Sequence, residues 1–497
     1  MLNIEKVLYI RRKVSELEKY SSYFYIAQSS TLCPLCLLFV SFVNPLTVQS
    51  GGSQRTQRIA QRTRRQVYEP IVKQLYRMKI TDVKTILLTG PCTNDPYLSE
   101  ARKLRSAAFI IIETDNGLKG VGETYAGYFF PEGVPPIVDF FKPILVGNGV
   151  EDIPELWRRM YHCGNFWCRV GLGAIVLAGI EAALWDLKGK ALGLPVYKLL
   201  GEIWKKDFTK TSDGKSIYSE HERIPCYATG GPSNYPIDKL ASKIDFYCSL
   251  GFRGVKLGAG AYYKEKGSEI SNDPTEAADF EASKANYIRQ RFGNDLWLMF
   301  DAHMGNHSKL TWGLETSTAV AKALEPFDLI FFEEPLHYTR PDEYADLVKR
   351  TSTPIAGGEC LTTLSEWQIF IKDDCFHIGQ PDASFTAGLD QFMQIASLLS
   401  SHGRSIAPHA WGAGASQMQN IHCGFACPNT VMLEVAPAYG PLHSELIGDS
   451  LQIKDGYVLP PEKPGLGIEL TENTINRFPF VPGTGEFNSV PGKILTT

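Results

Sequence analysis

Three acidic residues each close a short apolar run of the sequence and are followed by a polar loop. Asp301, Glu333 and Glu359 stand at the ends of three successive runs that have the length of buried strands. The carboxyl ends of parallel strands form the functional face of a (β/α)₈ barrel. Hard oxygen ligands that converge there suit Mg²⁺, which takes a few carboxylates and keeps positions open for water and substrate. Three unrelated helix-capping acids are the alternative, but the repetition favours a magnesium site.

Two further polar residues close the next candidate strands along the chain. Asp382 ends Gln380-Pro381-Asp382 and His409 ends Ala407-Pro408-His409. A carboxylate can fix the tautomer of an imidazole and raise its basicity, and imidazole titrates near neutral pH. The pair therefore predicts a general base. The alternative is a histidine whose ring is hydrogen-bonded into the core.

His303, Lys256 and Glu434 complete the candidate site. His303 stands two residues after Asp301, and because strand residues alternate between faces, we expect both side chains to point into the site. There, His303 would either take part in the reaction or only form a hydrogen bond to a substrate hydroxyl. Lys256 could neutralise a substrate carboxylate, or be a salt-bridged lysine of the barrel. Glu434 ends a last candidate strand, where a crowded acidic setting would favour its protonated, hydrogen-bond-donating form; the alternative is a salt-bridging glutamate.

The elements that would position these residues follow a repeating order. Short apolar runs alternate with amphipathic stretches, which is typical of a (β/α)₈ barrel. The eight runs are 224–228, 252–257, 296–300, 329–332, 355–356, 376–378, 405–407 and 431–433. Two long polar interruptions, 205–223 and 258–277, are interpreted as surface insertions. We therefore predict an α/β fold with a TIM-like barrel over residues 224–447.

A different pattern precedes the barrel. Residues 109–114 and 119–123 predict two strands joined by a hairpin turn at 115–117, and 173–192 predict a helix with one apolar face. We interpret 78–201 as an α+β capping domain, completed by a C-terminal segment, 448–497, that packs on it. Its polar loops 91–104 and 125–135 could reach over the barrel mouth.

Composition limits the remaining classes of protein. The 497 residues are 44% hydrophobic with a formal net charge of -4, which argues against nucleic acid as a partner. The eleven cysteines suggest buried apolar residues of an intracellular protein rather than a disulfide framework. Cys33-x-x-Cys36 and Cys423-x-x-x-Cys427 each lack the second pair of a structural zinc site.

The first 77 residues are basic and do not resemble the rest of the chain. Their apolar stretch near residues 37–43 is too short to span a bilayer, which takes about 20 residues. We interpret 1–77 as a disordered or targeting extension and expect no membrane span. We expect the protein in the cytoplasm, unless the extension acts as an export signal.

Several of these motifs together resemble a known family. Residues 181–190, residues 193–197, Glu333-Glu334-Pro335 and Ala356-Gly357-Gly358-Glu359 are similar to the hallmarks of the mandelate racemase/muconate lactonising branch of the enolase superfamily. The resemblance runs from about Met78 to about Gly467. It implies a capping domain plus a barrel, one Mg²⁺ per subunit and a homo-oligomer. It also implies a carboxylate substrate whose α-proton is removed to give a metal-stabilised enediolate.

The resemblance assigns roles residue by residue. The metal ligands match Asp301, Glu333 and Glu359, whereas Glu334 is only adjacent to the match. The His-Asp dyad matches His409 and Asp382, and Glu434 matches a glutamate that hydrogen-bonds the enediolate oxygen. The family often carries a second lysine as a base after Lys256-Leu257, but Gly258 stands there, which weakens a racemase interpretation.

His303 decides between the reactions of the family. The galactonate and gluconate dehydratase-like members carry a histidine here as general acid on the departing 3-hydroxyl. We therefore predict dehydration of an acid sugar to a 2-keto-3-deoxy acid. The alternatives are an epimerase, racemase or cycloisomerase on the same scaffold, and a catalytically silent binding protein. Specificity candidates near the mouth are Arg102, Arg105, His337, His307, Trp411 and Tyr128.

Overall fold

The capping part of the chain starts with a three-stranded antiparallel sheet, β1 (Ile80–Pro91), β2 (Leu104–Thr114) and β3 (Lys119–Thr124). The computed structural model describes residues 78–92, 104–208, 219–229, 237–260, 262–264, 267–269, 271–306, 311–412, 414–437 and 440–483. The predicted hairpin is confirmed. Its turn is held because the Thr114 hydroxyl donates to Asn116 Oδ1 at 2.7 Å, and Gly117 supplies a φ of 83°.

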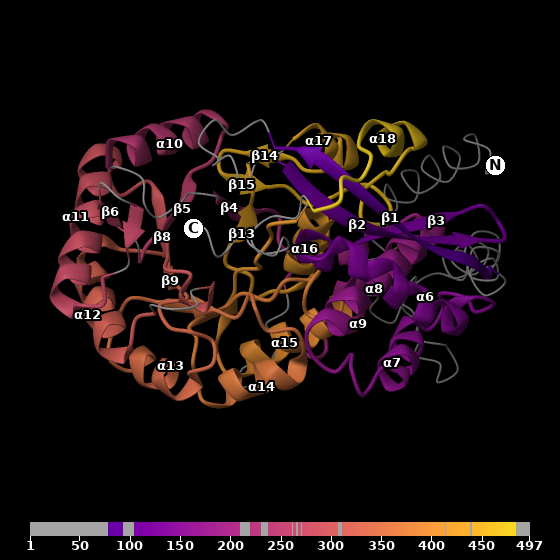
Figure 1. Cartoon of the computed structure of the whole chain (residues 1–497), viewed down its shortest axis with the longest axis horizontal. Coiled ribbons are helices and arrows are strands. Elements are labelled where there is room, and N and C mark those ends of the chain that lie inside the picture. The colour runs from indigo at the N-terminus through magenta and orange to yellow at the C-terminus, as the bar shows by residue number, and fades with distance from the viewer. Residues whose placement is uncertain are drawn as a thin grey trace, which may run out of the picture. The chain divides into compact units, whose positions relative to one another are not determined.

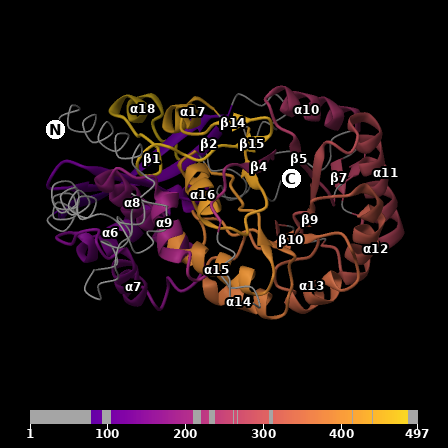
Figure 2. The ribbon, with the colours of Figure 1, turned by 180° about the vertical axis from the view of Figure 1, so that it is seen from behind.

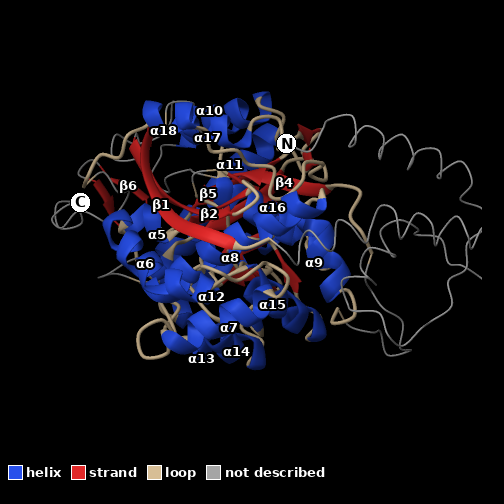
Figure 3. Ribbon diagram, turned by 90° about the vertical axis from the view of Figure 1, so that its right-hand side faces the viewer, coloured by secondary structure: helices blue, strands red, loops and turns tan. Residues whose placement is uncertain are grey.

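Helices follow this sheet in the chain, and several of them pack against it (Figure 3). They are α5 (Ala126–Phe129), α6 (Val134–Leu145), α7 (Ile153–Cys163), α8 (Leu172–Leu192) and α9 (Val196–Trp204), with a 3₁₀ turn η3 (Pro131–Gly133). The prediction of a polar loop over 125–135 is wrong: α5 and η3 occupy it, and Tyr125 and Tyr128 are buried. The aromatic side chains of this segment are buried against other residues, which its content of glycine and proline did not indicate.

The helix α8 is confirmed, but the prediction of one apolar face is wrong, because nearly its whole circumference is buried. It contacts β3 on one side and the barrel helix α15 (Leu389–Ser401) on another. The approach to β3 requires glycine: a Cβ on Gly122 would lie 2.2 Å from a backbone oxygen of α8. Burial on all sides explains why this helix is apolar almost throughout.

Eight parallel strands among the described residues form one curled sheet. They are β4 (Ile224–Ala228), β5 (Gly254–Gly258), β8 (Trp297–Asp301), β9 (Phe331–Glu333), β10 (Ile355–Gly357), β11 (Ile378–Gly379), β12 (Ser405–Ile406) and β13 (Leu433–Val435). The paired order is β13-β4-β5-β8-β9-β10-β11-β12. Each of the eight predicted runs overlaps one strand. The end strand β12 is joined by one parallel bridge, from Ile406 to Thr430, to the segment that precedes the other end strand, β13.

Helices cover the outside of this sheet (Figure 1). They are α10 (Ile237–Ser249), α11 (Pro274–Phe292), α12 (Leu314–Leu324), α13 (Pro341–Val348), α14 (Leu364–Lys372), α15 and α16 (Ala415–Ala426). Within the predicted insertion 258–277, a small hairpin pairs β6 (Tyr262–Lys264) with β7 (Gly267–Glu269). Inside the curl, one buried cluster fills the space below the site: Tyr227, Met299, Phe331, Ala356, Ile378, Ala407 and Met432.

The cap and the curled sheet share buried polar contacts. Glu123 of β3 donates its N–H to Gln419 Oε1 at 2.8 Å, and its carboxylate accepts the Ser416 N–H at 2.8 Å. Both partners belong to α16, which lies beside α9 (Figure 2). A misplaced cap would therefore leave a buried carboxylate without its donor, which is costly. These contacts fix the position of the cap on the barrel side.

The C-terminal part returns to both regions. β14 (Ile453–Lys454) and β15 (Tyr457–Val458) add an antiparallel extension to β4, and α17 (Pro441–Ile447) and α18 (Glu472–Arg477) follow the barrel strands in the chain order. Pro479 forms an antiparallel bridge with Leu88 of β1. No helix in the described segments combines the length and apolar character that crossing a bilayer requires.

The nine cysteines of the described residues are free thiols. Cys163 and Cys248 are exposed, so the expectation that the cysteines behave as buried apolar residues is wrong for these two. Cys423 and Cys427 are buried, and the Cys427 thiol contacts the Met393 sulfur at 3.5 Å. Cys33 and Cys36, with the whole 1–77 extension, lie outside the described residues.

Candidate active site

The predicted acids lie where parallel strands end. Asp301 and Glu333 are the last residues of β8 and β9 and are direct register partners. Glu359 follows β10 by two residues, and Glu434 lies in β13. Parallel register explains this placement, since strands that run in the same direction bring their carboxyl ends to one edge. The acidic residues therefore gather although up to 133 positions separate them in the sequence.

Lys256 of β5 lies at the centre of this acidic group. Its Nζ is 2.6 Å from Glu333 Oε1, 3.1 Å from Asp301 Oδ2 and 3.2 Å from Glu434 Oε1. Burial alone lowers the pKa of the ammonium, but the three carboxylates more than offset this and raise that pKa well above its ordinary value. The three carboxylates therefore favour the positively charged form of Lys256.

The acids respond unequally to burial. Burial and the neighbouring Asp301 charge raise the pKa of Glu333 to about 8, although Lys256 lowers it. Burial raises the pKa of Asp301 to about 6. Burial also raises that of Glu434, but the charges of Lys256 and His409 outweigh it, so the Glu434 pKa is lowered. These surroundings favour the ionised form of Glu434 over the protonated form that the sequence suggested, and its Oε2 accepts the Ala410 N–H at 2.7 Å.

His409 and Asp382 form the expected pair. His409 Nδ1 lies 2.8 Å from Asp382 Oδ2, so the ring presents Nε2 in the other direction, 3.5 Å from Glu359 Oε2. Asp382 Oδ1 in turn accepts the Ser384 N–H at 2.7 Å and the Asn420 amide at 2.8 Å. Asp382 is thus held from the side opposite the imidazole, and the imidazole has one orientation.

The surroundings of His409 favour its charged form. Burial lowers the pKa of the imidazole, but the charges of Glu359 and Glu434 and the hydrogen bond to Asp382 together raise it to about 10. From the cap, the Tyr125 ring approaches with its centroid 5.7 Å from that of His409. The ring is therefore enclosed by carboxylates on one side and by the cap on the other.

His303 does not continue strand β8. The strand ends at Asp301, and His303 has a φ of 50°, so the expectation that strand alternation points both side chains inward is wrong. Its side chain is 43% exposed and lies at the Asp301 carboxylate, with Nε2 3.0 Å from Oδ2. The His303 N–H also donates to Asp301 Oδ1 at 3.0 Å. His303 is therefore adjacent to the site through a turn.

The specificity candidates fall into two groups. Arg105 is fully buried, donates to the Gly412 carbonyl at 3.1 Å and lies 4.5 Å over the Trp411 ring, whose indole N–H donates to the Tyr128 hydroxyl. Arg105 and Tyr128 of the cap therefore contact Trp411, which stands two residues after His409 in the sequence. His337 is partly exposed and hydrogen-bonded to Thr339. Arg102 and His307 lie outside the described residues.

Comparison with known proteins places this architecture. Residues 92–201 match the family model "Mandelate racemase / muconate lactonizing enzyme, N-terminal domain", and residues 239–474 match "Enolase C-terminal domain-like". This chain belongs to the mandelate racemase/muconate lactonizing enzyme family. The matched segments include the cap helices and every strand of the curled sheet except β4.

Relatives within this family perform different reactions. An arabinonate dehydratase of Saccharolobus solfataricus is 28% identical over 74% of this chain and 89% of its own length. A D-galactarolactone cycloisomerase of Agrobacterium fabrum is 27% identical over 81% of this chain and 99% of its own. The structure of L-talarate dehydratase from Polaromonas sp. JS666, complexed with Mg and L-glucarate, aligns with a TM-score of 0.66 and 27% identity, over 81% of this chain and 97% of that one.

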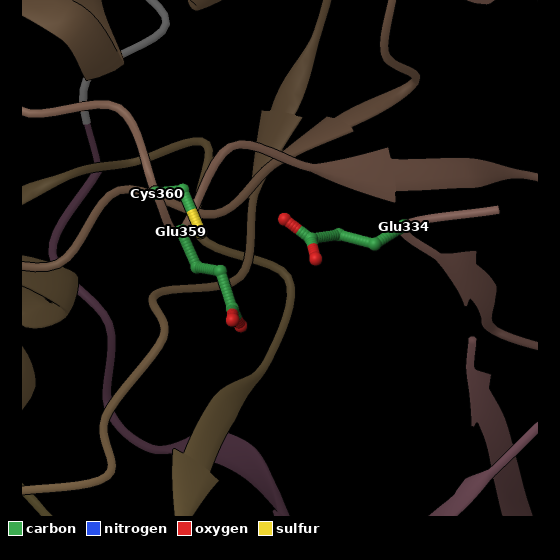
Figure 4. A group of neighbouring side chains, drawn as sticks. All are labelled: Glu334, Glu359 and Cys360. Atoms are coloured by element: carbon green, nitrogen blue, oxygen red, sulfur yellow. The ribbon is translucent and has the colours of Figure 1, made fainter. Parts of the chain in front are cut away.

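Two features of this family member were not anticipated. Gln380 donates its amide N–H to Glu333 Oε2 at 2.7 Å; its position two residues before Asp382 was the available signal. In addition, Glu334, Glu359 and Cys360 bring one ligand atom each to within 4.8 Å of one another (Figure 4). Among the described residues, no group of this kind includes Asp301 or Glu333. Glu334 and Cys360 each directly follow a predicted ligand in the sequence, and this adjacency was the available signal.

Proposed function

We propose that this chain catalyses the Mg²⁺-dependent dehydration of an acid sugar, an aldonate of the galactonate or gluconate type, to a 2-keto-3-deoxy acid. The proposal makes the enzyme a carbon-oxygen lyase with a (β/α)₈-type barrel closed by its cap. Support comes from the dehydratases among the relatives and from the base, acid and carboxylates gathered at one edge. The substrate class is taken from those relatives.

The residue types suit a magnesium ion, although among the described residues Asp301, Glu333 and Glu359 do not bring their ligand oxygens within 4.8 Å of one another. Asp301, Glu333 and Glu359 would hold it, since hard carboxylate oxygens are the ligands that Mg²⁺ prefers. Asp301 Oδ2 is buried and has ionic contacts with Lys256 and His303, but it accepts no hydrogen bond of good geometry. When bound, the ion would supply positive charge that stabilises the charge developing on the substrate carboxylate and offsets the carboxylates that raise the pKa of His409.

The chain's own residues would carry the proton transfers. His409, in its neutral form, takes the proton from C2 through Nε2, because Nδ1 is occupied by Asp382. Asp382 orients the ring and stabilises the imidazolium that forms. Lys256 supplies a buried positive charge near the substrate carboxylate. His303 gives a proton to the departing 3-hydroxyl, and the resulting enol tautomerises to the 2-keto acid.

The observation that carries the proposal is the oriented base: Nε2 of His409 directed toward Glu359, with Asp382 behind it. The test is a colorimetric screen for 2-keto acid over a library of acid sugars, with His409→Asn as the matched control. Asparagine removes the base and keeps a polar side chain. Keto acid formed by the native chain and lost in the variant supports the assignment. Keto acid formed equally by the variant refutes it.

One observation favours a second reaction, epimerisation or cycloisomerisation. His303 lies outside the strand, partly exposed and turned to Asp301, so its place as the acid for a leaving hydroxyl is less fixed than the place of His409 as base. A cycloisomerase is also among the relatives. Deuterium from D₂O entering recovered substrate, without keto acid, would favour this reaction. His303→Asn distinguishes the two, because it should stop elimination and leave deuterium exchange at C2.

Two broader expectations remain proposals. We propose a homo-oligomer on the basis of the family, to be tested by light scattering of the purified full chain. We propose residence in the cytoplasm, to be tested by fractionation of the native protein. A monomer, or export of the chain with cleavage near residue 77, would each overturn one of them without bearing on the reaction.

A further inference from the structure

Glu334 is a buried carboxylate that the proposed mechanism does not use. It directly follows β9, has a φ of 41°, and its backbone N–H donates to the Ala356 carbonyl at 3.1 Å. Its residue surface is 2% exposed, and its Oε2 accepts no hydrogen bond. A buried carboxylate oxygen without a donor is unfavourable, so Oε2 calls for a partner that binds there.

The side chain is directed at two other potential ligands. Figure 4 shows the Glu334 carboxylate extending toward the Cys360 sulfur, with the Glu359 side chain beside it. One ligand atom from each of the three residues lies within 4.8 Å of the others. Gly305 leaves room on the far side, since a Cβ there would lie 2.9 Å from Glu334 Oε2. The group is therefore an arranged set of two oxygens and one sulfur.

The sulfur determines which ion fits. Mg²⁺ prefers oxygen ligands, whereas thiolate with carboxylate suits Zn²⁺ and related ions. Bond lengths of about 2.3 Å to sulfur and 2.0–2.2 Å to oxygen place the ligands of a tetrahedral zinc about 3.5 Å apart. Side-chain rotations alone could close the group from its present spacing. We propose that Glu334, Glu359 and Cys360 form a second cation site, selective for a soft divalent ion of the Zn²⁺ class.

This site shares one residue with the proposed magnesium site. Glu359 belongs to both sets, so an ion held by Glu334 and Cys360 would compete for a carboxylate that Mg²⁺ needs. Zinc would therefore weaken magnesium binding by competing for Glu359. This competition does not depend on which acid sugar is the substrate. The binding of the soft ion itself does not depend on the proposed reaction, and its test needs no substrate.

The test uses the full chain, stripped of metal with a chelator and titrated with Co²⁺ as a spectroscopic substitute for Zn²⁺. Only a sulfur ligand gives a near-ultraviolet charge-transfer band with Co²⁺, so ions bound by oxygen alone are silent. We expect the band to saturate at one ion per chain and to disappear when Zn²⁺ is added. Its absence in the native chain overturns the proposal.

Three variants assign the band to residues. Cys360→Ser should abolish it, and Glu334→Gln, which keeps the shape of the side chain, should weaken Co²⁺ binding at least tenfold. Cys375→Ser is the matched control: this buried free thiol precedes β11, at the opposite end of the strands, and its loss should change nothing. Thermal melting verifies folding, and if Cys360→Ser does not fold, Cys360→Ala and Glu334→Gln decide. A band that survives replacement of Cys360, or an unchanged Co²⁺ affinity in Glu334→Gln, refutes the site.

Discussion

Replacing Lys256 with methionine should destabilise the metal-free protein and strengthen its binding of Mg²⁺. The ammonium lies within 3.2 Å of three carboxylates that are all buried. Removing one partner of a buried ion pair costs about 3–5 kcal/mol. We expect the lower end, about 3 kcal/mol, because the acids can relieve part of the repulsion by binding protons. The measurement is the free energy of unfolding by urea after chelation.

The magnesium effect has the opposite sign for a physical reason. Lys256 and a bound cation would neutralise the same carboxylates, so the lysine competes with the ion. Without it, the apparent affinity for Mg²⁺ should rise at least tenfold, about 1.4 kcal/mol. Calorimetric titration measures the affinity, and added Mg²⁺ should restore most of the lost stability through mass action.

Lys284→Met is the matched control. Lys284 is equally buried and lies 2.6 Å from Glu281 Oε2, but its ion pair is with that acid and not with Asp301 or Glu333. We expect a comparable loss of stability that Mg²⁺ does not repair. If Lys256→Met is neutral in stability, or if its affinity for Mg²⁺ is unchanged, the assignment of these carboxylates to the ion is refuted.

Three further predictions follow from particular contacts. Asp382→Asn should lower kcat by roughly 10³–10⁴ with a smaller change in KM, because the ring of the base loses its fixed tautomer; the keto-acid assay measures both, and an unaltered kcat contradicts the dyad. Glu181 has a pKa raised well above 4.5 by burial and by the charge of Asp390. The protonated form of Glu181 stabilises the folded state, and this contribution is lost as pH rises through the folded-state pKa. Glu181→Gln should therefore increase the free energy of unfolding more at pH 8 than at pH 5. An equal change at both pH values contradicts this sign. Gly122→Ala should cost about 1–3 kcal/mol of unfolding free energy, since its Cβ would meet a backbone oxygen of α8 at 2.2 Å, whereas Gly313→Ala, with nothing within 4 Å, should cost less; equal costs contradict the packing argument.

The sequence predicted strand ends well because two local signals agree there. Asp301 and Glu333 follow apolar runs, and the structure places both at the ends of adjacent parallel strands. His409 and Asp382 were paired on the same reasoning and lie 2.8 Å apart. The regular order of a parallel sheet converts one-dimensional position into proximity, so residue type and spacing were sufficient.

Properties that depend on contacts between distant residues were not predictable. The lowered pKa of Glu434 results from the charges of Lys256 and His409, which come from other parts of the chain. The turn at His303 depends on where the hydrogen bonding of β8 stops, and the positive φ of this single residue marks that point. Glu334, which is directed toward Cys360, likewise has a positive φ, and the sequence Glu-Glu-Pro does not predict this angle.

The carboxylate of Glu123 joins β3 to α16, and the buried helix α8 contacts both β3 and the barrel helix α15. A chain that lacked the cap would leave these groups facing water or bare, so the strands could not serve as an independent catalytic module. The cap and the strands of the curled sheet would therefore have to be retained together in evolution.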